Sequence, residues 1–185
     1  RFHQVEEDFK AGRVSAKNLS NKQKAVFLDR DGTINKYVGF LRNIDEFELI
    51  DGVADAIKKI NASGYLAMVV TNQPVIARGE VSFEELEEIH NKMEPLLGNP
   101  HKGYEGERPE LKFDCDCRKP KPGMLLKAAL DFNIDLAQSW MIGDSENDVK
   151  AGQNAGCRTA LIGNESYGQT VTVSSLKDFV EQYLK

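Results

Sequence analysis

The most constraining feature of the sequence is a short apolar run that ends in two aspartates one residue apart. Ala25 to Leu28 are all apolar, too few for a helix, and do not alternate with polar residues. This pattern predicts a strand buried on both faces of a parallel sheet. Asp29 then falls at the carboxyl end of the strand, and in open α/β sheets that end faces the ligand crevice.

The spacing of the two aspartates predicts a cation site. Residues two apart in an extended backbone point to the same side, so Asp29 and Asp31 address one site before Gly32 turns the chain. Two carboxylates this close repel each other unless a cation lies between them, and Mg²⁺ best suits the oxygen ligands. A calcium-binding loop fits poorly, because Thr33 and Ile34 stand where that loop has a further ligand and a glycine. A purely structural acidic turn would leave the repulsion uncompensated.

Length and charge limit the functional classes. The chain has 185 residues, of which 24 are basic, 29 acidic and 41% hydrophobic, with a net charge of −5, and this indicates one globular domain with a sizeable core. The acidic balance argues against a nucleic-acid partner. No apolar stretch reaches membrane-spanning length, and no signal-peptide pattern opens the chain. Cys115, Cys117 and Cys157 leave one cysteine over in any disulfide scheme, which favours a reducing cytoplasm.

From Lys24 onward, strand and helix patterns alternate, which predicts an α/β domain over residues 24–185 with a doubly wound, Rossmann-like parallel sheet. Residues 1–23 are polar with scattered apolar positions, and we expect an amphipathic helix followed by a linker. Further strands are expected at 65–70, 140–143, 158–162 and 170–173. Helices are expected at 52–63, from Ser82 to near Leu97, at 122–132, directly after Asp144, and from 174 or 175 to 184.

Polar residues also follow two other expected strands. Thr71 and Asn72 come after the second strand, and Asp144 comes after the strand at 140–143. The carboxyl ends of strands in a doubly wound sheet meet at one edge, so we expect these groups to converge with Asp29 and Asp31. Taken alone, Thr71 and Asn72 could instead cap a turn.

Four motifs stand in order along the chain: Asp29-Arg-Asp-Gly-Thr33, Thr71-Asn72, Arg118-Lys-Pro-Lys-Pro122, and Gly143-Asp-Ser-Glu-Asn-Asp148. Together they resemble the haloacid dehalogenase-like phosphatases, and the resemblance covers about residues 24 to 184. Four motifs in order are far more specific than any one of them.

Phosphoryl transfer needs an in-line nucleophile, a bridging cation and donors to the phosphate oxygens. We expect Asp29 to attack phosphorus and form an aspartyl-phosphate. Asp31 would protonate the leaving oxygen and later deprotonate the attacking water. Asp144 would complete the Mg²⁺ site with Asp29 and the backbone carbonyl of Asp31. Lys119 would neutralise nucleophile and phosphate, although an ordinary solvated lysine is the alternative.

The remaining expected site residues support this centre. Thr71 and Asn72 would donate hydrogen bonds to the phosphate oxygens. Asp148 lies one helical turn after Asp144 and is expected to support the site without binding the metal.

The particular residues within these motifs limit the resemblance to a smaller group of phosphatases. Phe27-Leu-Asp-Arg-Asp-Gly-Thr-Ile-Asn35 and Cys115-Asp-Cys-Arg-Lys-Pro120 are similar to the D-glycero-D-manno-heptose 1,7-bisphosphate phosphatase and histidinol-phosphate phosphatase family. The resemblance implies a capless enzyme of carbohydrate metabolism, in heptose biosynthesis, that removes the C7 phosphate of the heptose bisphosphate. Histidinol phosphate is the alternative substrate. It also implies that Arg118 recognises the rest of the substrate, with help from Arg78, since an arginine fork suits a second phosphate.

These relatives carry a structural zinc held by a Cys-x-His pair and a Cys-x-Cys pair. Cys115 and Cys117 match the second pair, and His101 is a weak candidate for the first, because Asn99 stands where a thiolate belongs. Gly98 to Tyr104 offers no apolar run for the strand that the sheet needs there. We therefore expect a segment of about 10 to 15 residues, a strand plus a turn, to be missing between Gly98 and Asn99.

The amino-terminal segment resembles the tail that follows a sugar-phosphate nucleotidyltransferase domain in bifunctional heptose enzymes, and a disordered tail is the alternative. A different hypothesis is a non-catalytic, zinc-stabilised module for such a transferase. The presence of Asp29, Asp31, Lys119 and Asp144 together argues against that hypothesis.

Overall fold

The computed structural model describes residues 21–39, 41, 43–72, 82, 84–85, 87–89, 91 and 116–184, and the backbone of 101–105. In order, the strands are β1 (Lys24–Leu28), β2 (Tyr65–Thr71), β3 (His101–Glu105), β4 (Trp140–Gly143), β5 (Arg158–Ile162) and β6 (Val171–Val173). The helices of these residues include α2 (Val53–Ala62), α5 (Gly123–Phe132), α6 (Glu146–Ala155) and α7 (Leu176–Tyr183), with 3-10 turns η1 (Ile44–Glu46) and η2 (Leu136–Gln138).

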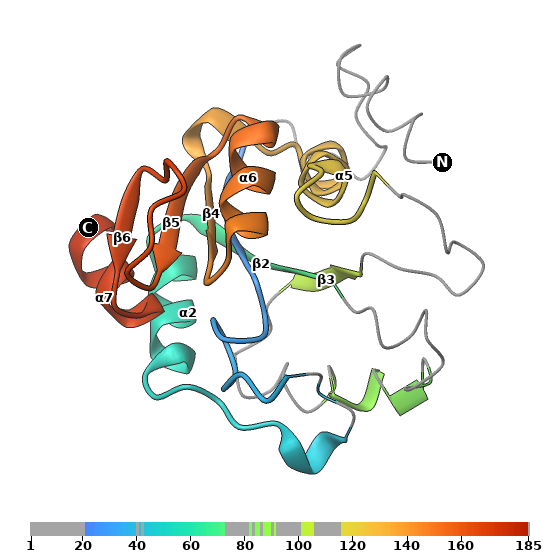
Figure 1. Cartoon of the computed structure of the whole chain (residues 1–185). Coiled ribbons are helices and arrows are strands. Elements are labelled where there is room, and N and C mark those ends of the chain that lie inside the picture. Colours follow the sequence, from blue (N-terminus) through green and yellow to red (C-terminus); the bar gives the residue numbers. More distant parts are fainter. Residues whose placement is uncertain are drawn as a thin grey trace.

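The strands form one parallel sheet in the order β3-β2-β1-β4-β5-β6 (Figure 1). β1 lies in the middle, between β2 and β4, and the strand order reverses there. This confirms the predicted doubly wound sheet. A crevice for ligands forms at such a reversal, outside the carboxyl ends of the strands.

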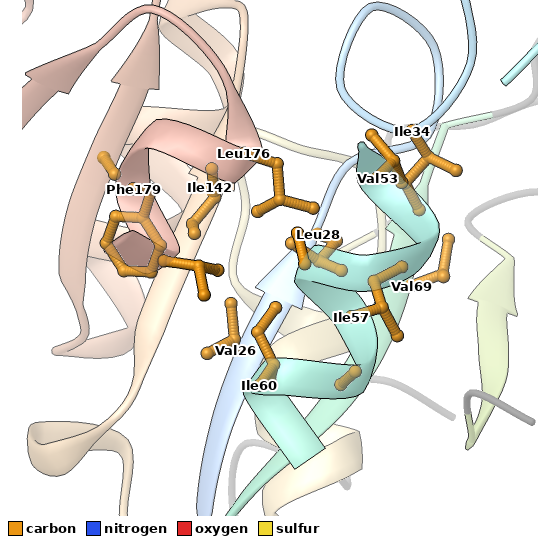
Figure 2. Packing of buried hydrophobic residues seen from close by; sticks show 14 of the residues in the cluster. Val26, Leu28, Ile34, Val53, Ile57, Ile60, Val69, Ile142, Leu176 and Phe179 are labelled. Atoms are coloured by element: carbon orange, nitrogen blue, oxygen red, sulfur yellow. The ribbon is translucent and has the colours of Figure 1, made fainter. Parts of the chain in front are cut away.

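The core has two layers, one on each face of the sheet. Val26 and Leu28 of β1 pack with α2 and α7 on one face, while Ala25 and Phe27 pack with α5 and α6 on the other. Figure 2 shows the first layer, in which side chains of β1, α2 and α7 pack together. Alternate residues of a strand face opposite sides, so a strand covered on both faces must be apolar throughout, which explains the unbroken run at 25–28.

The predicted strands at 65–70, 140–143, 158–162 and 170–173 and the helices at 52–63, 122–132, after Asp144 and from 174 or 175 to 184 agree with the structure to within a residue or two. Ser82 and Glu85 form a capping box where a helix was expected to begin: Glu85 accepts a hydrogen bond from the Ser82 N–H, and the Ser82 hydroxyl accepts one from the Glu85 N–H. The described residues between Thr33 and Asp51 form only η1, turns and isolated bridges, as expected of a capless enzyme. Among the helices that the structure describes, none is long and apolar enough to cross a bilayer.

The expectation that the segment from Gly98 to Tyr104 lacks a strand is wrong. β3 occupies His101–Glu105 and pairs in parallel with β2, where Met68 faces His101 and Val70 faces Tyr104. An edge strand is held by backbone hydrogen bonds to one neighbour, so it does not need the apolar run of a central strand. The Gly98–Asn99 junction itself lies outside the described residues.

Backbone hydrogen bonds tie Gln23, just before β1, to the segment that follows α5. Gln23 donates its N–H to the carbonyl of Asn133, and its own carbonyl accepts from the N–H of Asp135. The expected helix within residues 1–23 otherwise falls outside the described residues.

Candidate active site

The predicted groups converge on one cavity at the carboxyl edge of the sheet. The cavity has a volume of about 260 Å³ and is lined by Asp29, Asp31, Tyr37, Gly39, Thr71, Asn72, Lys119, Asp144, Ser145, Asn147 and Asp148. A larger cavity of about 510 Å³ lies near the end of α5 and is mostly apolar. The ionisable groups gather at the smaller cavity, so the chemistry belongs there.

Lys119 is the centre of the site. Its Nζ lies 2.7 Å from Oδ1 of Asp29, 2.6 Å from Oδ1 of Asp148 and 2.9 Å from the carbonyl oxygen of Val70. Burial alone would lower the pKa of Lys119, but the carboxylates of Asp29 and Asp148 outweigh it and raise that pKa. Lys119 is therefore a buried cation beside the expected nucleophile, not a solvated lysine.

Two of the carboxylates that line the cavity, Asp29 and Asp144, hold protons more tightly than ordinary aspartates. Burial raises the pKa of Asp29 to about 7; Lys119 counteracts this effect and Asp148 adds to it. The pKa of Asp144 is raised to about 6 by burial of its carboxyl group and by Asp148, although the residue as a whole is exposed. The crowded acidic pocket thus favours a bound cation.

Asp148 is fully engaged by neighbouring groups. Its Oδ2 accepts hydrogen bonds from the N–H and hydroxyl of Ser145, which is the capping residue of α6, and its Oδ1 accepts from Lys119. A Cβ on Gly143 would lie 2.3 Å from the Asp148 carboxyl group, so only glycine fits there. These contacts agree with the supporting role expected of Asp148.

Asn72 makes contacts that the sequence did not suggest. Its Nδ2 donates to the Lys119 carbonyl and its Oδ1 accepts from the Lys119 N–H, both at 3.1 Å. The side chain therefore joins the end of β2 to the backbone of Lys119. Thr71 is buried beside it, in the cavity lining where it was expected.

Asp31 is held by two residues that the sequence analysis did not select. The Arg30 guanidinium donates to both oxygens of the Asp31 carboxylate, and the Asn35 amide donates to Oδ1. Arg30 and Asn35 are completely buried. A signal was present in the sequence, since an arginine between two aspartates after a buried strand needs a carboxylate partner if it is buried.

Other expected site residues are only partly covered. Arg118 is exposed and precedes Lys119, but it does not line the cavity. Arg78, Cys115 and the side chain of His101 lie outside the described residues. Tyr37, which the sequence analysis did not select, is 68% exposed and lines the cavity.

The acidic cluster fits a hard divalent cation. One carboxylate oxygen each from Asp29, Asp144 and Asp148 lies within 4.8 Å of the others. Oxygen-only donors are what Mg²⁺ prefers. Because Asp148 is already occupied by Lys119 and Ser145, Asp29 and Asp144 are the side chains best placed to bind the ion.

Cys117 does not present a thiolate in this structure. It is buried and disulfide-bonded, with its partner outside the described residues, whereas Cys157 is a free buried thiol. Zinc binds the thiolate form of cysteine. The zinc-ligand role expected of Cys117 stays a prediction.

Comparisons with known proteins agree with the motifs. Residues 116–182 match a family model described as HAD-hydrolase-like. The D-glycero-beta-D-manno-heptose-1,7-bisphosphate 7-phosphatase of Haemophilus ducreyi is 41% identical over 76% of this chain and 82% of its own length. That of Escherichia coli K12 is 39% identical over 78% and 81%. The chain belongs to this phosphatase family. It is accordingly a haloacid dehalogenase-like phosphoric monoester hydrolase, and the hypothesis of a non-catalytic module is not supported.

Comparison of the fold with solved structures agrees with this family. The D,D-heptose 1,7-bisphosphate phosphatase of B. bronchiseptica, crystallised with magnesium and phosphate, superposes with a TM-score of 0.78 at 30% identity, over 88% of this chain and 98% of the other. A phosphatase from Mesorhizobium loti, described as HAD-like, superposes with a TM-score of 0.77 at 29% identity, over 91% and 90%. The α/β architecture is thus shared over 88–91% of the chain.

Proposed function

We propose that this phosphatase removes the C7 phosphate of D-glycero-D-manno-heptose 1,7-bisphosphate with the help of Mg²⁺. The substrate assignment rests on the shared name of relatives that are 38–42% identical to the chain. The contacts of Lys119 with Asp29 and Asp148 support the reaction class, because phosphoryl transfer depends on positioning and charge neutralisation.

The reaction has two steps. The Asp29 carboxylate attacks phosphorus as the bond from phosphorus to the C7 oxygen breaks, and Asp31 gives that oxygen a proton. Water then attacks the aspartyl-phosphate and loses a proton to Asp31, which releases phosphate and restores Asp29. Bound to Asp29, Asp144 and the Asp31 carbonyl, Mg²⁺ would neutralise the charge that develops on the phosphate oxygens.

Lys119 and Thr71 complete the centre. The three N–H donors of Lys119 contact Asp29, Asp148 and the Val70 carbonyl, so its positive charge beside Asp29 would lower the repulsion between that carboxylate and the phosphate. Thr71 lines the cavity beside it and supplies a hydroxyl donor. Asn72 and Arg118 are proposed to contact the substrate at the rim, with Arg78 as a further candidate.

The first prediction tests the nucleophile. Asn at position 29 cannot form an aspartyl-phosphate, so Asp29→Asn should lower kcat by at least about 10⁴-fold while the far-ultraviolet circular dichroism stays unchanged. Rates are measured by phosphate release from both anomers of the heptose bisphosphate and from histidinol phosphate. Wild-type-like turnover in Asp29→Asn would overturn the assignment of Asp29 as the nucleophile. Faster hydrolysis of histidinol phosphate than of the heptose bisphosphate would overturn the proposed substrate.

We propose that zinc binds only when the cysteines of the Cys-x-Cys pair are reduced. Cys115 and Cys117 would then be thiolate ligands, with His101 as a weaker candidate. Metal analysis after purification in reductant should give about one zinc per chain, against none after oxidation. Zinc-free reduced protein would remove the site from the proposal.

We also propose a cytoplasmic enzyme, and a nucleotidyltransferase domain preceding residue 1 in the full-length chain. The polar character of residues 1–23 supports a linker. Reading the gene upstream of Arg1 tests this arrangement.

A further inference from the structure

The Asp31 carboxylate is held asymmetrically by its two neighbours. Oδ1 accepts three hydrogen bonds, from Arg30 Nε at 3.2 Å, Arg30 Nη2 at 3.0 Å and Asn35 Nδ2 at 3.1 Å. Oδ2 accepts from Arg30 Nη2 at 2.8 Å. Arg30 and Asn35 thus contact both oxygens of the carboxylate and fix its plane.

The two donors are themselves fixed. Arg30 and Asn35 are both 0% exposed, and the Arg30 carbonyl accepts hydrogen bonds from the backbone N–H groups of Thr33, Ile34 and Asn35. The Gly32 N–H donates to the Asn35 carbonyl at 2.8 Å, and Asn35 Nδ2 also donates to the Lys36 carbonyl. A buried side chain inside a closed turn has few alternative rotamers. The turn therefore sets the angle of the Asp31 carboxylate.

We propose that Arg30 and Asn35 are positioning residues that orient the Asp31 carboxylate so that it exchanges a proton with the leaving oxygen of the substrate. This inference rests on the proposed function of Asp31 as the acid and base. Neither Arg30 nor Asn35 lines the cavity, so they act through Asp31 and not on the substrate. Proton transfer requires heavy atoms within hydrogen-bond reach, so a small rotation of the carboxylate is enough to slow it.

Leaving-group chemistry distinguishes positioning from general damage. A sugar alkoxide needs a proton as it leaves, whereas p-nitrophenolate is a weak base and leaves without one. The ratio kcat/KM covers the steps up to departure of the leaving group, so it reports this difference. If Asp31 is misplaced, kcat/KM falls for the heptose bisphosphate and is nearly unchanged for p-nitrophenyl phosphate.

The test uses two variants and one control. Asn35→Leu removes the amide donor at similar volume, and Arg30→Lys keeps the charge but loses the two-pronged fork. The control is Asn61→Leu, which removes a hydrogen bond to the Ala67 N–H on the amino-terminal half of β2. Thermal unfolding shows which variants fold, and Asn35→Leu decides the question if Arg30→Lys does not fold.

We expect both variants to lower kcat/KM for the heptose bisphosphate by about 10- to 100-fold, because general acid catalysis contributes about 10²- to 10⁴-fold in all. The loss on p-nitrophenyl phosphate should stay below about threefold, as it should for Asn61→Leu on both substrates. Equal losses on the two substrates would overturn the proposal. If the wild type cleaves p-nitrophenyl phosphate but not the heptose bisphosphate, the substrate proposal fails, and mannose 6-phosphate replaces it as the sugar ester in the same comparison.

Discussion

At the residue scale, position 32 requires glycine because of its backbone conformation and because the Asp144 side chain lies against it. Gly32 has a φ of +81°, and a Cβ there would lie 2.0 Å from Oδ2 of Asp144. The glycine therefore does two things: it turns the chain after Asp31, and it lets the Asp144 carboxylate approach the turn closely.

Gly32→Ala should displace Asp144 and lower the Mg²⁺ affinity by at least about tenfold, in addition to about 1–2 kcal/mol of backbone strain. Gly64→Ala is the matched control, because Gly64 has a φ of +76° with nothing within 4 Å of the added Cβ. Calorimetric titration with Mg²⁺ measures the difference. Equal Mg²⁺ affinities in the two variants would show that the contact with Asp144 does not matter.

The raised pKa values of Asp29 and Asp144 predict how pH affects metal binding. In the metal-free protein these values, about 7 and about 6, lie above those of the unfolded chain. The stability that the two groups contribute is therefore present at acid pH and is lost as the pH rises through 6 to 7. Mg²⁺ binds the deprotonated form, so it offsets this loss only at higher pH.

We expect the increase in Tm with saturating Mg²⁺ to be clearly larger at pH 8 than at pH 5.5. Differential scanning calorimetry over that range tests the sign. Asp144→Asn should weaken both the increase and its dependence on pH. An increase that is independent of pH in the wild type would contradict the prediction.

At the scale of elements, the end of β2 and the loop before α5 are joined by one side chain. Asn72 bonds both the N–H and the carbonyl of Lys119, and Asn154 of α6 donates to the next carbonyl, that of Pro120. The two bonds from Asn72 hold the lysine at the strand ends, where Nζ reaches Asp29.

Asn72→Leu should lower kcat by about 10- to 100-fold and stability by about 1–3 kcal/mol, because it leaves buried backbone groups of Lys119 unpaired. Asn154→Leu removes only an exposed hydrogen bond and should change kcat by less than about twofold. Steady-state kinetics and urea unfolding measure both effects. A similar kcat in the two variants would show that Asn72 is not required to place Lys119.

At the scale of the whole molecule, the catalytic edge and the core are separate parts of the same sheet. The layer formed by α2 and α7 packs on one face of the sheet (Figure 2). Ile57 in this layer is completely buried. Truncation there leaves a cavity in the core without contacting the site.

Ile57→Ala should lower the free energy of unfolding by about 2–5 kcal/mol and leave kcat unchanged. Lys58→Ala, on the exposed side of the same helix, should change stability by no more than about 0.5 kcal/mol. Urea unfolding followed by tryptophan fluorescence and assays at low temperature test the pair. A large fall in kcat for folded Ile57→Ala would show that the core and the site are coupled.

The sequence by itself determined the architecture and the main carboxylates. Apolar runs such as 25–28 and 140–143 can be buried only in the centre of a parallel sheet, and that topology places Asp29, Thr71 and Asp144 at one edge. These inferences depend on local patterns, which the chain carries at every position.

Only the tertiary structure decided how those carboxylates are held. The contacts of Asn72 with Lys119 and of Lys119 with Asp148 join residues 47 and 29 positions apart, and no local pattern records them. β3 escaped prediction because an edge strand can be held by backbone pairing with its neighbour, here β2, without an apolar run in its sequence. The orientation of Asp31 likewise depends on burial of Arg30, a property of the packed core that the order of residues does not display.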